Sequence, residues 1–222
     1  MKSQVRGGTR WKRFAVVMVP SVAATAAIGV GLAQGALAAS FSISGQEFKV
    51  KAKSLVGEDF VQYGSVNGGK DLDGNPFVAP VAVSGFSEAW ITDMCQSVVT
   101  PKVPVLGEVT LRLTAGDGKD KVYAKDIYLD VSSLKTNAEF KNIDIGVAAG
   151  ALNTGPDGKP IPGKPGIQPN TQAKPQGFGQ RAEHAVLNDV EQKAWATTAA
   201  TFKLPNLNLS LHRGTAQECF KD

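Results

Sequence analysis

Regular alternation of apolar and polar side chains is the feature that most constrains the fold of this chain. Successive side chains of an extended strand point to opposite faces, so an alternating segment buries one face of a sheet. We therefore predict a mainly β fold, sandwich-like or a curved sheet, with little helix beyond residue 38. The clearest alternating sets are Phe48/Val50/Ala52, Val109/Leu111/Leu113, Ile127/Leu129/Val131 and Leu207/Leu209/Leu211.

Turn signals separate these segments. Asp73-Gly74 lies in the stretch DLDGNP, and Asp117-Gly118 lies in AGDGKDK. Asp-Gly pairs between alternating runs are typical of hairpin tips. We expect a turn at the first and a hairpin at the second.

Four blocks of sequence recur in the same order, which suggests an internal duplication. In the clearest, residues 89–100 align with residues 185–196, and Asp93 falls on Asp189. We predict one β-rich domain over 39–222, built from halves of about 41–118 and 119–214. Residues 182–200 fit both helical and strand spacing, and a helix, if there is one, is expected there.

Residues 153–176 differ in composition from the rest. The stretch NTGPDGKPIPGKPGIQPNTQAKPQ combines many prolines and glycines with no aromatic residue. Such a segment has little to bury, so it predicts a solvated loop or semi-rigid spacer.

The first 38 residues have the order of a secretory leader. A basic head is followed by the apolar run FAVVMVPSVAATAAIGVGLA and then by small residues, with Ala36 and Ala38 at small-x-small spacing. We expect cleavage after Ala38 and therefore a secreted protein. An uncleaved anchor is the alternative, because about 20 apolar residues can span a bilayer.

Removing the leader changes the charge balance. The chain has 24 Lys and Arg against 20 Asp and Glu, and the leader holds five of the basic residues, which leaves 19 against 20. The mature chain is therefore close to neutral. Without a basic surface it is not expected to bind nucleic acid.

Cys95 and Cys219 are the two cysteines of the sequence. In an exported protein a pair of cysteines most simply forms a disulfide. The alternatives for Cys95, a nucleophile or a metal ligand, lack a nearby histidine or a second cysteine at ligand spacing.

Motifs of catalysis and cofactor binding are missing from the sequence. It contains no G-x-S-x-G nucleophile elbow and no phosphate-binding glycine loop, and its histidines are His184 and His212. We assign no catalytic, cofactor-binding or metal-binding residue. Asp71 and Asp73 suggest a turn rather than a calcium loop, because Ala82 stands where the bidentate glutamate would be.

Paired carboxylates could still converge in a groove, as a glycosidase requires. The candidates are Glu58, Asp59, Asp93, Asp126, Asp130, Asp144 and Asp189.

Aromatic residues are spread through the β segments. They predict an ordinary core, or alternatively an apolar groove between curved sheets for a greasy ligand. These residues are Phe41, Phe48, Phe60, Phe140, Phe202, Trp90 and Trp195.

Several blocks resemble a family of exported actinomycete proteins that is a domain-of-unknown-function family. They are FVQYG, VAVSGF, MCQSV, TLRLTAG, GFGQ, AWATTAATFKLPNL and the terminal ECF, and the resemblance covers essentially the whole chain. Some members carry the label "cholesterol esterase". The resemblance implies a cell-envelope role and a small multi-pass membrane protein as partner.

The expected function is therefore that of an exported, non-enzymatic envelope protein that binds a lipid or another hydrophobic ligand. The alternatives are a lipid-ester hydrolase, as the label implies, and a structural surface protein that self-assembles. A hydrolase would need His184 or His212 within hydrogen-bond reach of both a serine and a carboxylate.

Overall fold

The computed structural model of the chain describes residues 43–169 and 171–221. The predicted leader, the cleavage site after Ala38 and the alternative anchor lie outside the described residues. Within the described part, no helix is long and apolar enough to cross a membrane. The elements are β1 (Ile43–Ser44), β2 (Phe48–Lys70), β3 (Pro76–Thr92), β4 (Met94–Val103), β5 (Gly107–Ala115), β6 (Val122–Lys141), β7 (Asp144–Ala148), the 3-10 turn η1 (Ala149–Ala151), β8 (Phe178–Thr198), β9 (Thr201–Lys203) and β10 (Asn208–Arg213).

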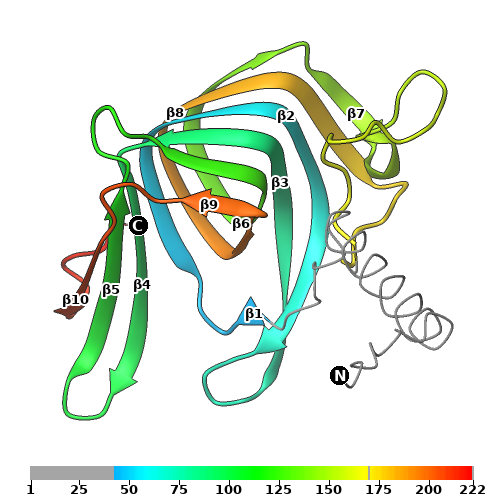
Figure 1. Ribbon diagram of the computed structural model, residues 1–222. Coiled ribbons are helices and arrows are strands. Elements are labelled where there is room, and N and C mark those ends of the chain that lie inside the picture. The colour runs from blue at the N-terminus through cyan, green and yellow to red at the C-terminus, as the bar shows by residue number, and fades with distance from the viewer. Residues whose placement is uncertain (1–42, 170, 222) are drawn as a thin grey trace, which may run out of the picture. The chain divides into compact units, whose positions relative to one another are not determined.

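Pairing between strands closes the sheet on itself. β2 pairs with β3, β3 with β6, β6 with β8, and β8 pairs back with β2, in every case antiparallel. These four strands, of 23, 17, 20 and 21 residues, form a closed ring whose long ribbons arch across the molecule (Figure 1). The predicted mainly β fold is confirmed as a strongly curved sheet, while the internal duplication stays a prediction.

Beyond the ring, β4, β5 and β10 extend the sheet outward from β2; we call these three strands the wing. β7 pairs with β8, β9 with β6, and β1 with β2. β5 and β6 each pair with other strands, so the hairpin predicted at Asp117-Gly118 is wrong. The residues form a turn there, but the strands that it joins separate. Residues 71–75 do form the expected turn, between β2 and β3.

Aspartates with left-handed backbone interrupt the long strands. Asp59, Asp126 and Asp189 lie within β2, β6 and β8, and Asp93 separates β3 from β4. Their φ angles are 51°, 49°, 52° and 52°. This region is costly for most L-residues, and Asp is among the few that visit it. Each aspartate is followed directly by a buried apolar residue: Phe60, Ile127, Val190 and Met94.

The aspartates shift the alternation of each strand by one residue, as a bulge does. In β6, Val122 and Ala124 are buried before Asp126, whereas Ile127 and Leu129 are buried after it. The buried residues on either side of the aspartate are therefore three apart instead of two. The same spacing, Leu187 to Val190, gave residues 182–200 their helical appearance. The question left open for this segment is answered as strand, because Phe178–Thr198 form the single strand β8.

Two apolar clusters lie on opposite faces of the ring strands, as the alternation of adjacent residues such as Phe60 and Val61 requires. The larger one includes Leu55, Phe60, Phe86, Ile127, Leu129 and Leu187. The smaller one joins Val61, Tyr63, Val81 and Val83 to Ala149 and Leu152, and Ile167 and Ala173 pack against it.

The proline-rich segment 153–176 is only partly the solvated spacer that was predicted. Pro165, Gly166 and Gln168 are buried, while Ile167 packs on the smaller cluster. Composition predicted little burial because the segment has no aromatic residue. The segment is buried because it packs on aromatic residues of the ring strands, such as Tyr63 and Tyr128.

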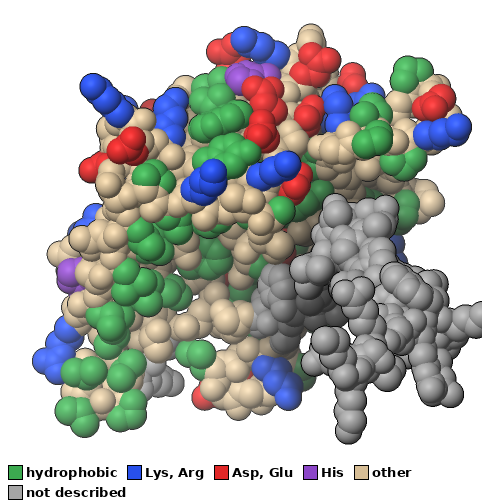
Figure 2. All heavy atoms as spheres, in the orientation of Figure 1, with side chains coloured by type: hydrophobic (Ala, Val, Ile, Leu, Met, Phe, Trp, Pro, Cys, Tyr) green, Lys and Arg blue, Asp and Glu red, His purple; other side chains and the backbone are tan. Residues whose placement is uncertain are grey.

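Three leucines in or directly before β10 are also placed differently from the prediction. Leu207, Leu209 and Leu211 were expected on a buried face, but they are 50, 58 and 66% exposed. β10 is the edge strand of the wing, and it pairs with β5 alone. Figure 2 shows hydrophobic side chains gathered over the wing and at the β4–β5 turn, where Val105 and Leu106 are exposed.

The predicted disulfide between Cys95 and Cys219 is confirmed, with a Cα–Cα distance of 5.8 Å. It fixes the end of the chain to β4, where the Cys219 N–H also donates to Ser97 Oγ at 3.0 Å. Lys49 Nζ lies 2.7 Å from Glu218 Oε2 in a largely buried ion pair. In the chain-entropy model, a cross-link across 124 residues stabilises the fold by about 5 kcal/mol.

The left-handed backbone at Asp126 predicts how substitutions at this position change the stability of the fold. Asp126→Val should lower the free energy of unfolding by about 1–2 kcal/mol, because a β-branched residue is strained at positive φ. Asp126→Gly should leave it unchanged or raise it slightly. Urea unfolding of the oxidised protein measures both. The aspartate side chain is exposed, so equal losses in the two variants would contradict a role of the backbone angle.

Candidate functional site

The two histidines each have one of the two partners that a hydrolase needs. His184 Nδ1 lies 2.9 Å from Glu58 Oε1, and His212 Nε2 lies 2.9 Å from Ser210 Oγ. Among the described residues, no hydrogen bond joins His184 to a serine or His212 to a carboxylate. Neither histidine lines the groove or the cavity described below.

The candidate carboxylates are mostly dispersed. Asp59 and Asp144 do meet at one groove, but Asp130 is bonded to Asn67, and Asp189 to Asn137. Burial raises the pKa of Asp130, and the hydrogen bond from Asn67 opposes this shift. In the described part of the chain, no three His, Cys, Asp or Glu side chains are grouped as metal ligands would be.

The aspartate of the suspected calcium loop has local partners instead. Asp71 accepts hydrogen bonds from the backbone N–H groups of Asp73 and Asn75 and from the Asn75 side chain. These bonds lower the pKa of Asp71, with those from Asn75 contributing most.

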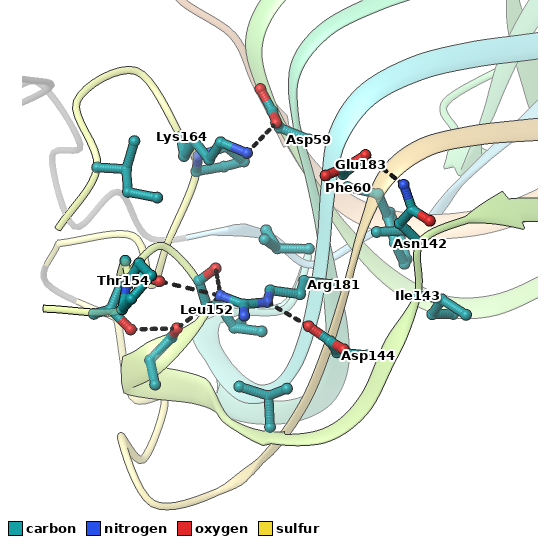
Figure 3. Close-up of a pocket in the computed structure, with 18 residues that line it drawn as sticks. Asp59, Phe60, Asn142, Ile143, Asp144, Leu152, Thr154, Lys164, Arg181 and Glu183 are labelled. Atoms are coloured by element: carbon teal, nitrogen blue, oxygen red, sulfur yellow. Dashed lines mark hydrogen bonds and ion pairs between the residues drawn. The ribbon is translucent and has the colours of Figure 1, made fainter. Parts of the chain in front are cut away.

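The groove, of about 650 Å³, lies where β7, η1 and the proline-rich segment meet β2 and β8 (Figure 3). Each of its charged side chains has a partner, which is an opposite charge in two cases and an amide in the third. Lys164 Nζ lies 3.0 Å from Asp59 Oδ1, and Arg181 Nε donates to Asp144 Oδ2 at 3.0 Å. Asn142 Nδ2 donates to Glu183 Oε2 at 2.6 Å.

These contacts tie the proline-rich segment to the ring. Arg181 Nη1 also donates to the carbonyl oxygens of Leu152 and Thr154, at 3.4 and 3.2 Å. Deeper in, the N–H of Gln168 donates to Tyr63 Oη at 3.0 Å and that of Gly166 to Tyr128 Oη at 3.2 Å. Burial raises the pKa of both phenols, so each stays protonated at neutral pH. The groove is thus the contact region between the proline-rich segment and the ring strands. Most of its polar side chains are already ion-paired or hydrogen-bonded.

A separate cavity of about 190 Å³ lies inside the ring, and all four ring strands contribute to its wall. Most of the wall is apolar, and the remaining residues are uncharged. Leu134 and Ala138 of β6 are exposed, so the cavity opens to solvent beside them. The lining residues are Leu55, Phe60, Gln62, Ser84, Phe86, Leu129, Leu134, Thr136, Ala138, Phe140, Gln180, Leu187 and Gln192.

Aromatic rings form one part of this wall. The Phe60 ring centroid is 5.4 Å from that of Phe86 and 5.0 Å from that of Phe140. Phe60 also borders the groove, so its side chain is common to both spaces.

Polar groups form another part of the wall, and most of them are paired. Gln62 Nε2 donates to Ser84 Oγ at 2.9 Å, and Gln180 Nε2 donates to Gln62 Oε1 at 2.7 Å. Thr136 Oγ1 donates to the carbonyl oxygen of Asn188. The side-chain amide of Gln192 is bonded to no other residue in the described structure.

Sequence reasoning found only the aromatic half of this site. Phe60 and Phe140 were among the residues considered for an apolar groove, and both line the cavity. Trp195 instead packs against the tilted ring of Phe77, and Trp90 against that of Tyr123. Phe48 packs against the larger cluster, Phe202 is exposed, and Phe41 lies outside the described residues. The glutamines were missed because their positions relative to one another depend on strand register.

A family model described as a family of unknown function, DUF6230, matches residues 44–220. The chain belongs to DUF6230. The match confirms the resemblance to a family of unknown function, and it spans both cysteines and all four ring strands of this DUF6230 protein. Neither a curated protein nor a solved structure matches the chain. The actinomycete origin and the esterase label stay predictions.

The groove contacts predict that Arg181 holds the proline-rich segment in place. Arg181→Met should speed cleavage by the protease Asp-N before the exposed Asp157, because the ion pair and the bonds to backbone carbonyls are lost. Limited proteolysis followed on a reducing gel measures the rate. Arg213→Met removes an exposed arginine of β10 and should leave it unchanged. Equal rates in wild type and Arg181→Met would contradict this role.

Proposed function

We propose that this protein is an exported, non-enzymatic component of the cell envelope that binds a hydrophobic molecule inside its ring of strands. The observation that carries the proposal is the cavity of about 190 Å³, walled by apolar side chains from β2, β3, β6 and β8. The leader-like residues 1–38 support export. The disulfide suits an oxidising compartment.

Packing energetics support an occupant. Apolar surface that a ligand removes from water stabilises the complex by about 25 cal/mol per Å². Leu55, Phe86 and Leu187 are almost fully buried beside this space, so they are held apart rather than collapsed onto one another. A bound apolar group would cover this wall, which is accessible to solvent beside Leu134, and contact it closely.

The size of the cavity limits what enters it. An engineered apolar cavity of about 150 Å³ holds benzene, whereas drug-sized ligands use about 300–1,000 Å³. A cavity of about 190 Å³ therefore suits one end of a lipid, with the remainder leaving beside Leu134 and Ala138. An envelope lipid is the proposed ligand. A small multi-pass membrane protein is the proposed partner, on the basis of the family resemblance.

Secreted wild-type protein should carry a lipid adduct in its native mass spectrum. Ala138→Trp places a large ring at the mouth and should reduce the adduct strongly. Glu139→Trp is the matched control, because the neighbouring side chain points to the other face of β6 and is exposed. It should keep the adduct. An adduct-free mass in wild type, or equal occupancy in the two variants, would contradict the proposal.

Self-assembly at the wing is a second candidate, favoured by the exposed leucines of β10. An edge strand presents unpaired backbone groups, and exposed apolar side chains add to its tendency to pair. Light scattering over a range of concentrations should then show growing oligomers, which Leu209→Lys should abolish. A strict monomer at every concentration rules this candidate out. The lipid-ester hydrolase has no comparable support, because neither histidine has both partners.

A further inference from the structure

We infer that the ring cavity selects an uncharged ligand whose apolar end carries one hydrogen-bonding group, such as an alcohol, an ester or an amide, over a free fatty acid. The inference rests on the proposed function and concerns the same cavity. Two observations carry it: the wall has no charged side chain, and the amide of one lining glutamine is unpaired.

The described wall of the cavity carries no charged side chain. On β6, the lining residues Leu134, Thr136 and Ala138 alternate with Lys135 and Glu139, which are exposed on the other face. A carboxylate moved out of water without a cationic partner loses far more solvation than a neutral group. The cavity would therefore accept a neutral head group and reject an ionised one.

Cations in the adjoining groove do not supply the missing charge. The groove shares Phe60 with the cavity, and its basic residues are Lys164 and Arg181. Each is already paired with a carboxylate, Asp59 or Asp144. Recruiting either one would break a contact that holds the proline-rich segment.

Gln192 supplies the hydrogen-bonding position. Its side chain is 6% exposed and lines the cavity from β8, yet its amide has no partner among the described residues. The other glutamines of the wall, Gln62 and Gln180, are bonded to each other, and Gln62 also to Ser84. Among the described residues, Ser65 Oγ is the one fully buried side-chain polar atom without a partner, so the unpaired amide of Gln192 keeps contact with solvent and is available to a ligand.

A primary amide both donates and accepts hydrogen bonds. The Gln192 amide can therefore donate to the carbonyl oxygen of an ester or amide, or accept from the hydroxyl of an alcohol. One such group on an otherwise apolar ligand satisfies this residue. A pure hydrocarbon would fill the space and leave the amide unpaired.

Calorimetric titration with soluble six-carbon probes tests the selection. At about pH 8, hexanoate is fully ionised, while 1-hexanol and hexyl acetate are neutral. Both neutral probes should bind, and hexanoate should bind at least about tenfold more weakly. Equal binding of hexanoate and 1-hexanol overturns the inference and leaves the proposed function standing. No heat with any of the three probes overturns both.

Substitution of Gln192, with Gln176 as the control position, tests whether the Gln192 amide bonds the ligand. Gln192→Leu should weaken 1-hexanol binding about tenfold, the effect of losing one buried hydrogen bond, without destabilising the protein. Gln176→Leu, at an exposed glutamine of the proline-rich segment, should bind as wild type does. Wild-type affinity in Gln192→Leu overturns the role of the amide.

A charge placed at the mouth tests the electrostatic part independently. Leu134 is 38% exposed, so Leu134→Lys should fold and bring a cation to the edge of the cavity. It should strengthen hexanoate binding about threefold, as one solvent-exposed ion pair does, and so reduce the preference for 1-hexanol. Unchanged hexanoate binding in this variant overturns the electrostatic argument.

Discussion

Left-handed backbone at three aspartates of the ring strands is the constraint on which the closed sheet depends. A strand of about 20 residues that alternated without interruption would present one face throughout. Asp59, Asp126 and Asp189 each insert one residue, so the buried set changes from odd to even positions or the reverse. The strand also bends and twists more strongly at such a bulge. Four strands can then curve around one another and keep apolar side chains inside along most of their length.

The sequence allowed the strands to be predicted, but not the one-residue shifts of alternation at the aspartates. Alternation at Phe48, Val50 and Ala52 or at Ile127, Leu129 and Val131 is a local property, so it reveals a strand without knowledge of its neighbours. Across an aspartate, the apolar spacing becomes three, which resembles part of a helical pattern. The combination of an aspartate and a directly following buried residue, as in Asp189-Val190, is the signal that distinguishes the two cases. It recurs at Asp59-Phe60 and Asp126-Ile127.

The remaining errors arise where burial depends on distant parts of the chain. The leucines in and directly before β10 alternate with polar residues, as those of a half-buried strand do. Alternation shows that they share one face, but it does not show whether another element covers that face. The proline-rich segment has few apolar residues of its own, and it is partly buried because Tyr63 and Tyr128 offer hydroxyl groups to its backbone. The cavity depends on which residues of four strands face one another. Strand pairing and register, rather than composition, determine that arrangement, so the Gln192 amide could not be located from sequence.

The disulfide has a consequence for how the protein withstands cutting. Cys95 and Cys219 lie on either side of β6, the proline-rich segment and β8, so half of the ring is enclosed in one covalent loop. A protease that cuts once within that loop leaves both pieces joined through sulfur. The ring strands on either side of the cut stay tethered at high effective concentration, and they can pair again. Exposed turns such as residues 155–164 can thus be nicked without separating the two parts of the sheet.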